Sequence, residues 1–329
     1  MKKTKAIVLH KNGDADQMVW EEINLPDPDH GQVLLKHEFV GFNMIDIYHR
    51  SGIYPTPSKP CFLGTEASGV IEKVGPGVKN LNIGDRVAYA GSGSGLGSYS
   101  YSRVMNADDL ITIPDWMRSE VAAAILTKGR TVEYLFNRTY KLQKGDRILF
   151  NAAAGGVGQI AGQWAASIGA IAIGVVGSID KEKFARNSGY EHVFNMQDHD
   201  IVKEVMAITD GIGVDVVYDS IGKTTWDISL SVVKKLGLVV SFGSASGNPP
   251  LYDIAKDGVK NSAYIHRATM VNYMTSPEIS KKSAESVFGM IKNGSINLNL
   301  NMDYHLDDIV TVHQDAEARK TVGQIVMKV

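Results

Sequence analysis

The sequence predicts an α/β protein in which a doubly wound domain with a parallel sheet is inserted into a β-rich domain. Three observations predict this class. The first hundred residues alternate short apolar runs with turn residues, and from residue 146 strand-like runs alternate with amphipathic stretches. A glycine-rich turn joins the first of those later runs to a helix-like stretch. The length of 329 residues fits two domains.

Strand patterns and turns define the elements of the first part of the chain. Strands are predicted at residues 6–9, 33–37 and 67–74, and a turn followed by a short strand at residues 81–89. The Gly/Ser-rich run from Gly91 to Ser98 is predicted as a loop. It is either a plain surface connection or a mobile lip that closes on binding, and both interpretations stay open.

After Pro114 the apolar spacing becomes helical, so residues 120–140 are predicted as a helix. Strands are then predicted at residues 147–151, 171–176, 214–218, 238–242 and 263–265. Their alternation with helices indicates βαβ units and a parallel sheet. The last 35 residues return to short strands with one helix near residues 306–320. The predicted domains are 1–126 with 300–329, and 127–299.

The composition excludes several classes of protein. Thirty-four basic and 36 acidic side chains give a net charge of −2, so no basic footprint indicates nucleic acid as a partner. The single cysteine, Cys61, excludes an internal disulfide framework and a zinc site built from cysteines. It fits a reducing compartment, and we expect a cytoplasmic protein.

Residues 148–179 carry no charged side chain, and a hydropathy window alone would suggest a membrane span. The stretch contains Asn151, Gln159, Gln163 and several glycines, and it divides into a buried strand, a helix and a second buried strand. We therefore expect no membrane segment. The apolar stretch after the basic start of the chain is too short for a secretory signal.

The turn after the strand at residues 147–151 indicates a dinucleotide site. Ala153, Gly155 and Gly158 have the spacing of the dinucleotide fingerprint, with alanine at its first position. Gly155 would let the backbone approach a pyrophosphate, and Gly158 would let the helix pack close to the sheet. Free N–H groups at the start of the helix favour phosphate. The expected contacts are Ala154, Gly155, Gly156 and Val157.

The end of the next strand favours NADPH over NADH. NAD-binding folds usually place Asp or Glu there to hold the ribose, whereas this chain has Gly177 and Ser178. Lys181 follows, with further cations at residues 183 and 186, and these suit a 2′-phosphate. A solvated lysine on a helix face remains the alternative for Lys181. Asp180 is predicted as the N-cap of the following helix rather than as a ribose ligand.

These motifs resemble the medium-chain dehydrogenase/reductase superfamily and its zinc-free quinone oxidoreductase (zeta-crystallin-like) branch. Besides the glycine turn, the resemblance rests on residues 43–55, 64–69, 128–131, 217–222 and 241–243, which read NMIDIYHRSGIYP, GTEASG, KGRT, VYDSIG and SFG. They run in family order over nearly the whole chain. The resemblance implies a GroES-like β-rich catalytic domain plus a doubly wound Rossmann domain.

The resemblance also implies chemistry without zinc. Zinc-dependent relatives place a ligand cysteine where Asn43 stands and a histidine where Thr65 stands, and they also carry a structural zinc loop with four cysteines. This chain has only Cys61, so neither zinc site can be built here in the usual way. Alcohol oxidation through a zinc alkoxide is then not expected. The implied reaction is reduction of a quinone by NADPH in an interdomain cleft, by hydride or by single electrons. Reduction of an enal or enone is the alternative, and an NADPH sensor or structural protein without turnover is the alternative of another class.

The resemblance finally implies site residues and an assembly. Asn43, Asp46 and Tyr54 would line the cleft as catalytic groups, while Asp46 as a helix cap and Tyr54 as a turn aromatic are the structural alternatives. The further cofactor contacts implied are Asn43, Lys128, Thr131, Met196, Ser220, Phe242, Gly243, Ser244, Arg267 and Arg319. Met196 stands where relatives with a strong NADPH preference often have tyrosine. No metal ligand is expected, and a homodimer through the strand near residues 263–265 is expected.

Overall fold

The computed structural model describes residues 1–57, 59–91 and 95–329, which divide into two compact units. Unit 1 comprises Met1–Arg130, Tyr273–Val287 and Leu298–Val329, and unit 2 comprises Thr131–Asn272 and Phe288–Asn297. These bounds differ from the predicted domains mainly at Tyr273–Val287. That segment belongs to unit 1, where the Arg130 guanidinium donates to its Ser280 hydroxyl at 2.5 Å.

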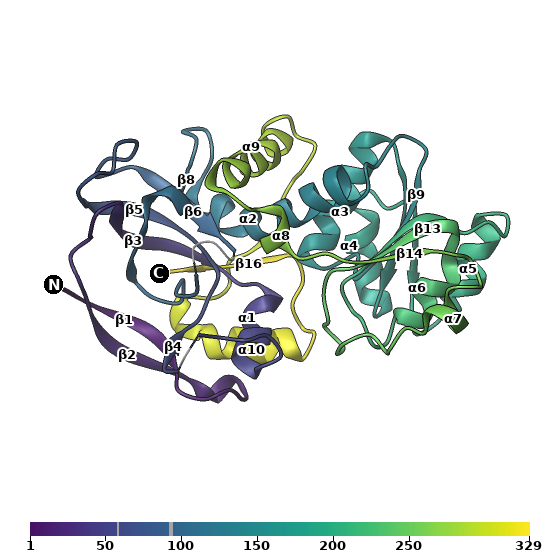
Figure 1. The fold of residues 1–329 in the computed structure, drawn as a ribbon, viewed down its shortest axis with the longest axis horizontal. Helices are drawn as coiled ribbons and strands as arrows, with labels where there is room; N and C mark the ends of the chain where they lie inside the picture. The colour runs from purple at the N-terminus through teal and green to yellow at the C-terminus, as the bar shows by residue number, and fades with distance from the viewer. Residues whose placement is uncertain (58, 92–94) are drawn as a thin grey trace. The chain divides into compact units, whose positions relative to one another are not determined.

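Unit 1 holds two β-sheets (Figure 1). A three-stranded sheet has the order β2-β1-β4, and a seven-stranded sheet has the order β15-β16-β3-β5-β6-β8, with β7 paired to β3. The strands are β1 (Lys2–Leu9), β2 (Met18–Leu25), β3 (Gln32–Gly41), β4 (Cys61–Phe62), β5 (Glu66–Val74), β6 (Arg86–Ala90), β7 (Ser102–Asn106), β8 (Ile111–Thr112), β15 (Leu300–Asn301) and β16 (Gln324–Lys328). The strands predicted at residues 6–9, 33–37 and 67–74 are confirmed within β1, β3 and β5, and the turn and short strand predicted at residues 81–89 are confirmed by β6.

The helices and helical turns of unit 1 flank these sheets. They are η1 (Ala15–Gln17), α1 (Met44–Ser51), η2 (Ala107–Asp109), η5 (Leu306–Asp308) and α10 (Ile309–Glu317). The last two confirm the helix predicted near residues 306–320. In the Gly/Ser run predicted as a loop, residues 92–94 lie outside the described residues. The backbone N–H groups of Gly97 and Ser98, at its far end, donate to the Gly64 carbonyl.

Two helices contribute several residues to each unit. They are α2 (Ser119–Tyr134) and α9 (Pro277–Lys292). The helix predicted at residues 120–140 is confirmed as α2, which is followed by a π-helical turn, η3 (Leu135–Thr139).

Unit 2 is built on one six-stranded sheet in which every neighbouring pair is parallel. The order is β11-β10-β9-β12-β13-β14, from the strands β9 (Arg147–Asn151), β10 (Ile171–Val176), β11 (His192–Asn195), β12 (Val214–Asp219), β13 (Val233–Ser241) and β14 (Tyr264–Arg267). The predicted parallel sheet is confirmed. The apolar strands β9, β10 and β12 are buried, as expected for a sheet covered on both faces.

The helices of unit 2 cover both faces of this sheet (Figure 1). They are α3 (Gly156–Ile168), η4 (Ile179–Lys181), α4 (Glu182–Arg186), α5 (Ile201–Ile208), α6 (Trp226–Val232), α7 (Ile254–Asp257) and α8 (Met270–Tyr273). Helix α3 contacts α4, and α5 contacts α6. Right-handed crossovers place these two pairs on opposite faces, because the sheet grows from β9 first toward β11 and then toward β14.

The charge-free stretch at residues 148–179 forms β9, α3 and β10, as predicted. Across residues 1–57, 59–91 and 95–329, no helix has both the length and the apolar character that a membrane crossing requires.

Close packing of α3 on the sheet depends on Gly158. A Cβ at this position would lie against the carbonyl oxygens of Ala152 and Ala153, the latter at 2.6 Å. The predicted role of Gly158 in helix–sheet packing is therefore confirmed. The helix ends at Gly169, whose φ of 83° is in the left-handed region that favours glycine.

We expect Gly158→Ala to lower the free energy of unfolding by about 1–3 kcal/mol, because the added methyl overpacks a site bounded by backbone. Gly289→Ala is the matched control, since a Cβ at this exposed helical glycine meets no atom within 4 Å. That change is expected to stabilise the protein by about 0.5–1 kcal/mol. Denaturant unfolding of both variants checks the pair, and equal effects of the two would contradict the packing argument.

Candidate functional site

The carboxyl ends of the six parallel strands of unit 2 meet at one edge of the sheet. This edge is where open α/β sheets bind ligands. It gathers thirteen of the predicted cofactor residues: Ala154, Gly155, Gly156 and Val157 after β9, Gly177, Ser178 and Lys181 after β10, Met196 after β11, Ser220 after β12, Phe242, Gly243 and Ser244 after β13, and Arg267 at the end of β14. The sequence therefore identified residues that the fold brings to one edge.

The turn from β9 to α3 is open on the side where Gly155 lies. Gly155 is the N-cap of α3, and a Cβ on it would meet only the Ala152 carbonyl oxygen, at 3.2 Å. Ala152 has a φ of 59°, a left-handed conformation that few residues other than glycine adopt. The open turn and the positive end of the helix dipole together fit a bound pyrophosphate.

The turn after β12 is organised by Asp219, to which the sequence analysis gave no role. This carboxylate is fully buried and accepts from the N–H groups of Ile221 (2.8 Å) and Gly222 (3.0 Å) and from the Ser229 (2.7 Å) and Thr225 (2.8 and 2.9 Å) hydroxyls. The donors lie two, three, six and ten residues further along the chain. Such a set of polar groups after a strand is the only local signal that could have identified Asp219.

Main-chain hydrogen bonds join this turn to the turn after β13. The N–H of Phe242 donates to the Asp219 carbonyl at 2.8 Å, and that of Ala245 donates to the Ser220 carbonyl at 3.2 Å. A Cβ at Gly243 would lie 3.0 Å from the Ser220 Cα, so the close approach requires glycine. The hydroxyl of Ser244 is buried and has no hydrogen-bond partner within the described part of the chain. An unsatisfied hydroxyl at this edge fits a site that holds a polar ligand.

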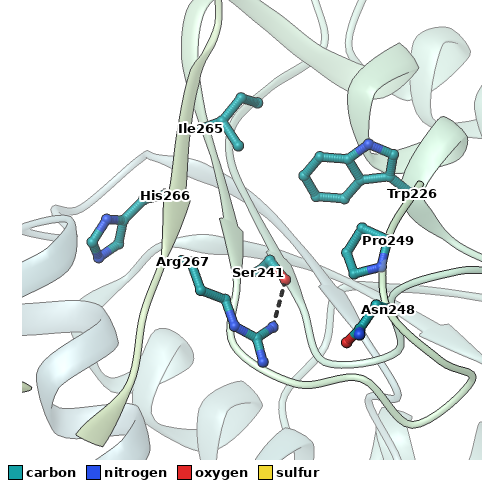
Figure 2. A pocket seen from close by; sticks show the side chains of 7 residues that line it. All are labelled: Trp226, Ser241, Asn248, Pro249, Ile265, His266 and Arg267. Atoms are coloured by element: carbon teal, nitrogen blue, oxygen red, sulfur yellow. Dashed lines mark hydrogen bonds between the residues drawn. The ribbon is translucent and has the colours of Figure 1, made fainter. Parts of the chain in front are cut away.

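Arg267 lies beside these turns (Figure 2). Its guanidinium donates to the Ser241 hydroxyl at 2.8 Å and to the Gly243 carbonyl at 2.9 Å. It borders a hollow of about 240 Å³, lined by Trp226, Ser241, Asn248, Pro249, Ile265, His266 and Arg267. Arg267 therefore supports the loop after β13 from the last strand of the sheet.

The edge at β10 has room for a ligand at Gly177, where a Cβ would meet no atom within 4 Å. The cations that follow are partly engaged with the protein. Arg186 donates to Glu182 and to the Val193 carbonyl, both at 3.2 Å, and the Lys183 ammonium lies 5.0 Å from the centre of the Phe184 ring. Lys181 is half-buried at the start of α4, next to this strand end, and its predicted phosphate contact stays a prediction.

The prediction that Asp180 is a helix N-cap is wrong. Asp180 lies inside the turn η4, and Ser178 and Lys181 occupy the N-cap positions of η4 and α4. Its carboxylate instead accepts a hydrogen bond from the Ser178 side chain, which lowers the pKa of Asp180. The Met196 side chain is 36% exposed, and its backbone N–H donates to the Val176 carbonyl at 3.0 Å, next to the same strand end.

Unit 1 surrounds Asn43 with buried polar groups. The Asn43 side-chain amide donates to Glu66 at 2.7 Å and to the Thr127 hydroxyl at 3.4 Å, and the N–H of Thr127 donates to the other Glu66 oxygen at 3.0 Å. Lys128 donates to the Phe42 carbonyl at 2.9 Å. Burial lowers the pKa of Lys128, while the Glu66 and Asp46 carboxylates act in the opposite direction.

Asp46 lies inside unit 1 with no exposed surface and acts as a helix cap, the structural alternative of the sequence analysis. Its carboxylate accepts from the Asn43 N–H, the Thr65 hydroxyl and the Tyr99 hydroxyl, each at 2.9 Å. Burial raises the pKa of Asp46 to about 7, and the three donors and Lys128 oppose this shift.

The remaining predicted site residues differ in burial and in their place in the fold. Tyr54 is half-buried in the turn after α1, where its ring packs edge-on against Tyr48 with 5.1 Å between ring centres. Thr131 is buried on α2, three residues after Lys128. Arg319 is exposed just after α10, with a left-handed φ of 59°. An arginine held in this strained conformation is consistent with a functional role for its position.

The residues at the positions of the zinc ligands do not fit a metal. The Asn43 amide nitrogen faces a carboxylate as a donor, and the Thr65 hydroxyl donates to Asp46. Among the residues that the structure describes, no three His, Cys, Asp or Glu side chains are grouped so that they could hold a metal ion.

Two buried histidines that the sequence analysis missed lie in the same unit. His37 contacts the Ser100 carbonyl at 2.6 Å and the Tyr89 hydroxyl at 2.9 Å, and burial lowers its pKa to about 4. His313 is also fully buried, and desolvation, aided by Arg50, lowers its pKa to about 3. Both imidazoles are therefore neutral at physiological pH.

Known protein families match segments in both parts of the chain. The profile described as "Alcohol dehydrogenase GroES-like domain" matches residues 29–115, and that described as "Zinc-binding dehydrogenase" matches residues 156–284. A quinone oxidoreductase of Pseudomonas aeruginosa is 38% identical over 323 residues, covering 98% of this chain and 99% of that protein.

Two further similar proteins bear on cofactor and substrate. A 2-haloacrylate reductase of a Burkholderia species is 37% identical over 329 residues and 98% of each chain. The Escherichia coli quinone oxidoreductase solved in complex with NADPH has a TM-score of 0.95 and 38% identity, covering 99% of this chain and 100% of that chain.

The buried titratable groups predict how stability depends on pH. Between about pH 4 and the ordinary histidine pKa of 6.5, the unfolded chain binds protons at His37 and His313 that the folded chain excludes, so both favour folding more as pH rises. Asp46 acts oppositely between pH 3.8 and about 7, because only the folded chain keeps its proton.

We therefore expect His37→Gln to make the rise in unfolding free energy over pH 4.5–6.5 shallower and Asp46→Asn to make it steeper. Each group changes the slope by at most about 1.4 kcal/mol per pH unit. Denaturant unfolding at several pH values measures these slopes, and identical slopes in both variants and the parent would contradict the assignment.

Proposed function

Since this chain belongs to the medium-chain dehydrogenase/reductase superfamily, in its quinone oxidoreductase branch, we propose that it is an NADPH-dependent, zinc-independent quinone reductase. NADPH, when bound, supplies the reducing equivalents. The main support is the carboxyl edge of the unit 2 sheet, where an open glycine turn meets two rigidly joined loops. Asn43 and Thr65 at the positions of the zinc ligands support a reaction without metal.

The residues at this edge would bind successive parts of NADPH. The turn of Ala154, Gly155, Gly156 and Val157 binds the pyrophosphate, as the helix dipole favours. Gly177, Ser178, Lys181 and Met196 bind the adenosine end. The loops that carry Ser220, Phe242, Gly243 and Ser244, with Arg267 behind them, bind the rest of the cofactor. The contacts of Asn43, Lys128, Thr131 and Arg319 with NADPH rest on the family resemblance.

The catalytic groups of the proposal are Asn43 and Tyr54, which orient the acceptor. Asp46 is buried, so it acts through Asn43, whose backbone N–H it holds. The product oxygen takes its proton from water or from a hydroxyl such as that of Tyr54.

Reduction of an α,β-unsaturated carbonyl is the second candidate. The Burkholderia relative, named for its action on 2-haloacrylate, is about as similar to this chain as the quinone oxidoreductases are. Both acceptors are electron-poor alkenes conjugated to a carbonyl, so the same reductant serves either. Fold alone does not decide between them.

A steady-state assay with a small quinone, an enal and an enone tests the proposed function. We expect oxidation of NADPH by the quinone at a rate that a metal chelator leaves unchanged. Turnover with the enal or enone alone would favour the second candidate. Tight binding of NADPH without turnover of any acceptor would contradict an enzyme and favour a sensor.

Lys181→Ala tests the proposed 2′-phosphate contact. Loss of one charge-assisted hydrogen bond costs about 1.5–3 kcal/mol, so the dissociation constant for NADPH should rise about tenfold or more while that for NADH stays unchanged. Fluorescence titration of both cofactors measures this. Lys144→Ala, a change at a lysine before β9, is the control, and equal losses for NADPH and NADH would contradict the assignment.

We also propose a cytoplasmic homodimer that binds no nucleic acid. The edge strand β14 supports pairing, because Tyr264 is 65% and Ile265 37% exposed. The one cysteine, Cys61, is free and fits a reducing compartment, and the net charge of −2 argues against nucleic acid.

Light scattering tests the assembly. We expect a dimer mass for the parent and a monomer mass for Ile265→Lys, since a lysine on an edge strand opposes pairing. Ile212→Lys, at another exposed position of unit 2, is the control and should stay dimeric. A monomeric parent would contradict the dimer.

A further inference from the structure

A chain of hydrogen bonds inside unit 1 connects α10 to the turn that carries Asn43; helices α1 and α10 lie side by side (Figure 1). Glu317, at the end of α10, pairs with Arg50 of α1, with 3.0 Å between Oε2 and Nη1. Arg50 Nη1 lies 3.4 Å from His313 Nδ1, and His313 Nε2 lies 3.1 Å from the Tyr99 hydroxyl. The Tyr99 hydroxyl then donates to Asp46 at 2.9 Å.

Only the Glu317 end of this chain reaches the surface. Arg50 is 1% exposed and His313, Tyr99 and Asp46 have no exposed surface, whereas the Glu317 side chain is 41% exposed. Buried polar groups depend on one another for their hydrogen bonds, because water is not available as a substitute. A change at one member is therefore transmitted to the next.

While Asp46 is ionised, each hydrogen bond in the chain has a single direction. A guanidinium has only donors, so His313 Nδ1 accepts from Arg50, and this pairing assigns the imidazole proton to Nε2. Nε2–H then donates to the Tyr99 oxygen, which leaves the Tyr99 O–H to donate to Asp46. Because a guanidinium does not release its proton at physiological pH, the chain holds an orientation and does not conduct protons.

The titratable groups that interact with Asp46 are Lys128 of α2 and the hydroxyls of Tyr99 and of Tyr89 on β6. Glu66 of β5 acts on Lys128 as Asp46 does, whereas Arg50 and Glu317 lie further along the chain of hydrogen bonds and His313 is neutral. Lys128 favours the ionised Asp46, and so do the donors Asn43, Thr65 and Tyr99. Burial favours its protonated form, so the two forms are balanced near neutral pH.

We propose that Tyr99 and His313 are positioning residues for Asn43: through Asp46 they hold the start of α1, and with it the Asn43 amide, in one orientation. This inference rests on the proposed function, in which Asn43 contacts the reacting molecules. When Asp46 takes up a proton on Oδ2, that oxygen becomes a donor, and its hydrogen bonds from the Asn43 N–H and the Tyr99 hydroxyl weaken. Removal of the Tyr99 hydroxyl favours that protonated form.

Tyr99→Phe tests this with Tyr101→Phe as the matched control, because the Tyr101 hydroxyl donates to the exposed Asp307 instead. We expect the pH midpoint of kcat in Tyr99→Phe to rise by about one unit, which lowers kcat at pH 7 about fivefold with a smaller change in KM. His313→Leu should act likewise. His313→Gln should keep the parent profile, because its amide can accept from Arg50 and donate to Tyr99. Tyr101→Phe should also keep it.

Infrared difference spectra give a readout that needs no turnover. The carboxyl band that Asp46→Asn removes should titrate near pH 7 in the parent and about one unit higher in Tyr99→Phe. The inference would be overturned if Tyr99→Phe and His313→Leu lost only thermal stability and kept the parent's midpoints in both the pH dependence of kcat and the infrared titration. If those variants do not fold, the absence of a titrating Asp46 band between pH 5 and 9 in the parent overturns it. If the protein reduces no acceptor, only the proposed function is contradicted. The infrared titration still tests the inference, because it reports on Asp46 without turnover.

Discussion

A carboxylate removed from water must collect hydrogen-bond donors, and in both units this requirement shapes the turn on which the candidate site depends. Asp219 draws in two backbone N–H groups and two hydroxyls, and thereby fixes the loop of Ser220. Asp46 draws in one N–H and two hydroxyls, and thereby fixes the start of α1. Because all of these donors are neutral, the free-energy cost of burying the two carboxylates is offset by hydrogen bonds more than by opposite charge.

The parts of the fold that the sequence predicted are those governed by local pattern. β9 and β10 were predicted residue for residue, because a parallel strand covered on both faces is a continuous apolar run between turns. β2 was not predicted, since its burial alternates only weakly and it owes its place to pairing with β1. β13 begins five residues earlier than predicted, because its first residues include two lysines at the edge of the unit.

In the candidate site, too, the residues that could be predicted are those governed by local pattern. Residues at strand ends could be predicted, because all parallel strands of one sheet deliver their carboxyl ends to one edge. The partners of Asp46 could not be predicted, since Tyr99 lies 53 residues from it and 214 residues from His313. Asp180 shows the limit at short range: a helical turn that starts two residues earlier made it a partner of Ser178 instead of a cap.

The order of segments along the chain has a consequence for synthesis. Unit 2 is nearly contiguous in sequence. Unit 1 is not, because its larger sheet includes β16 between β15 and β3 and its core includes His313, which contacts the Tyr99 hydroxyl. A ribosome releases the chain from its N-terminal end, so the β-strands that precede residue 131 emerge long before the segment that completes their core. During translation the inserted unit can fold first, while the earlier strands can pair with one another but lack β16 and His313 until the last 32 residues arrive.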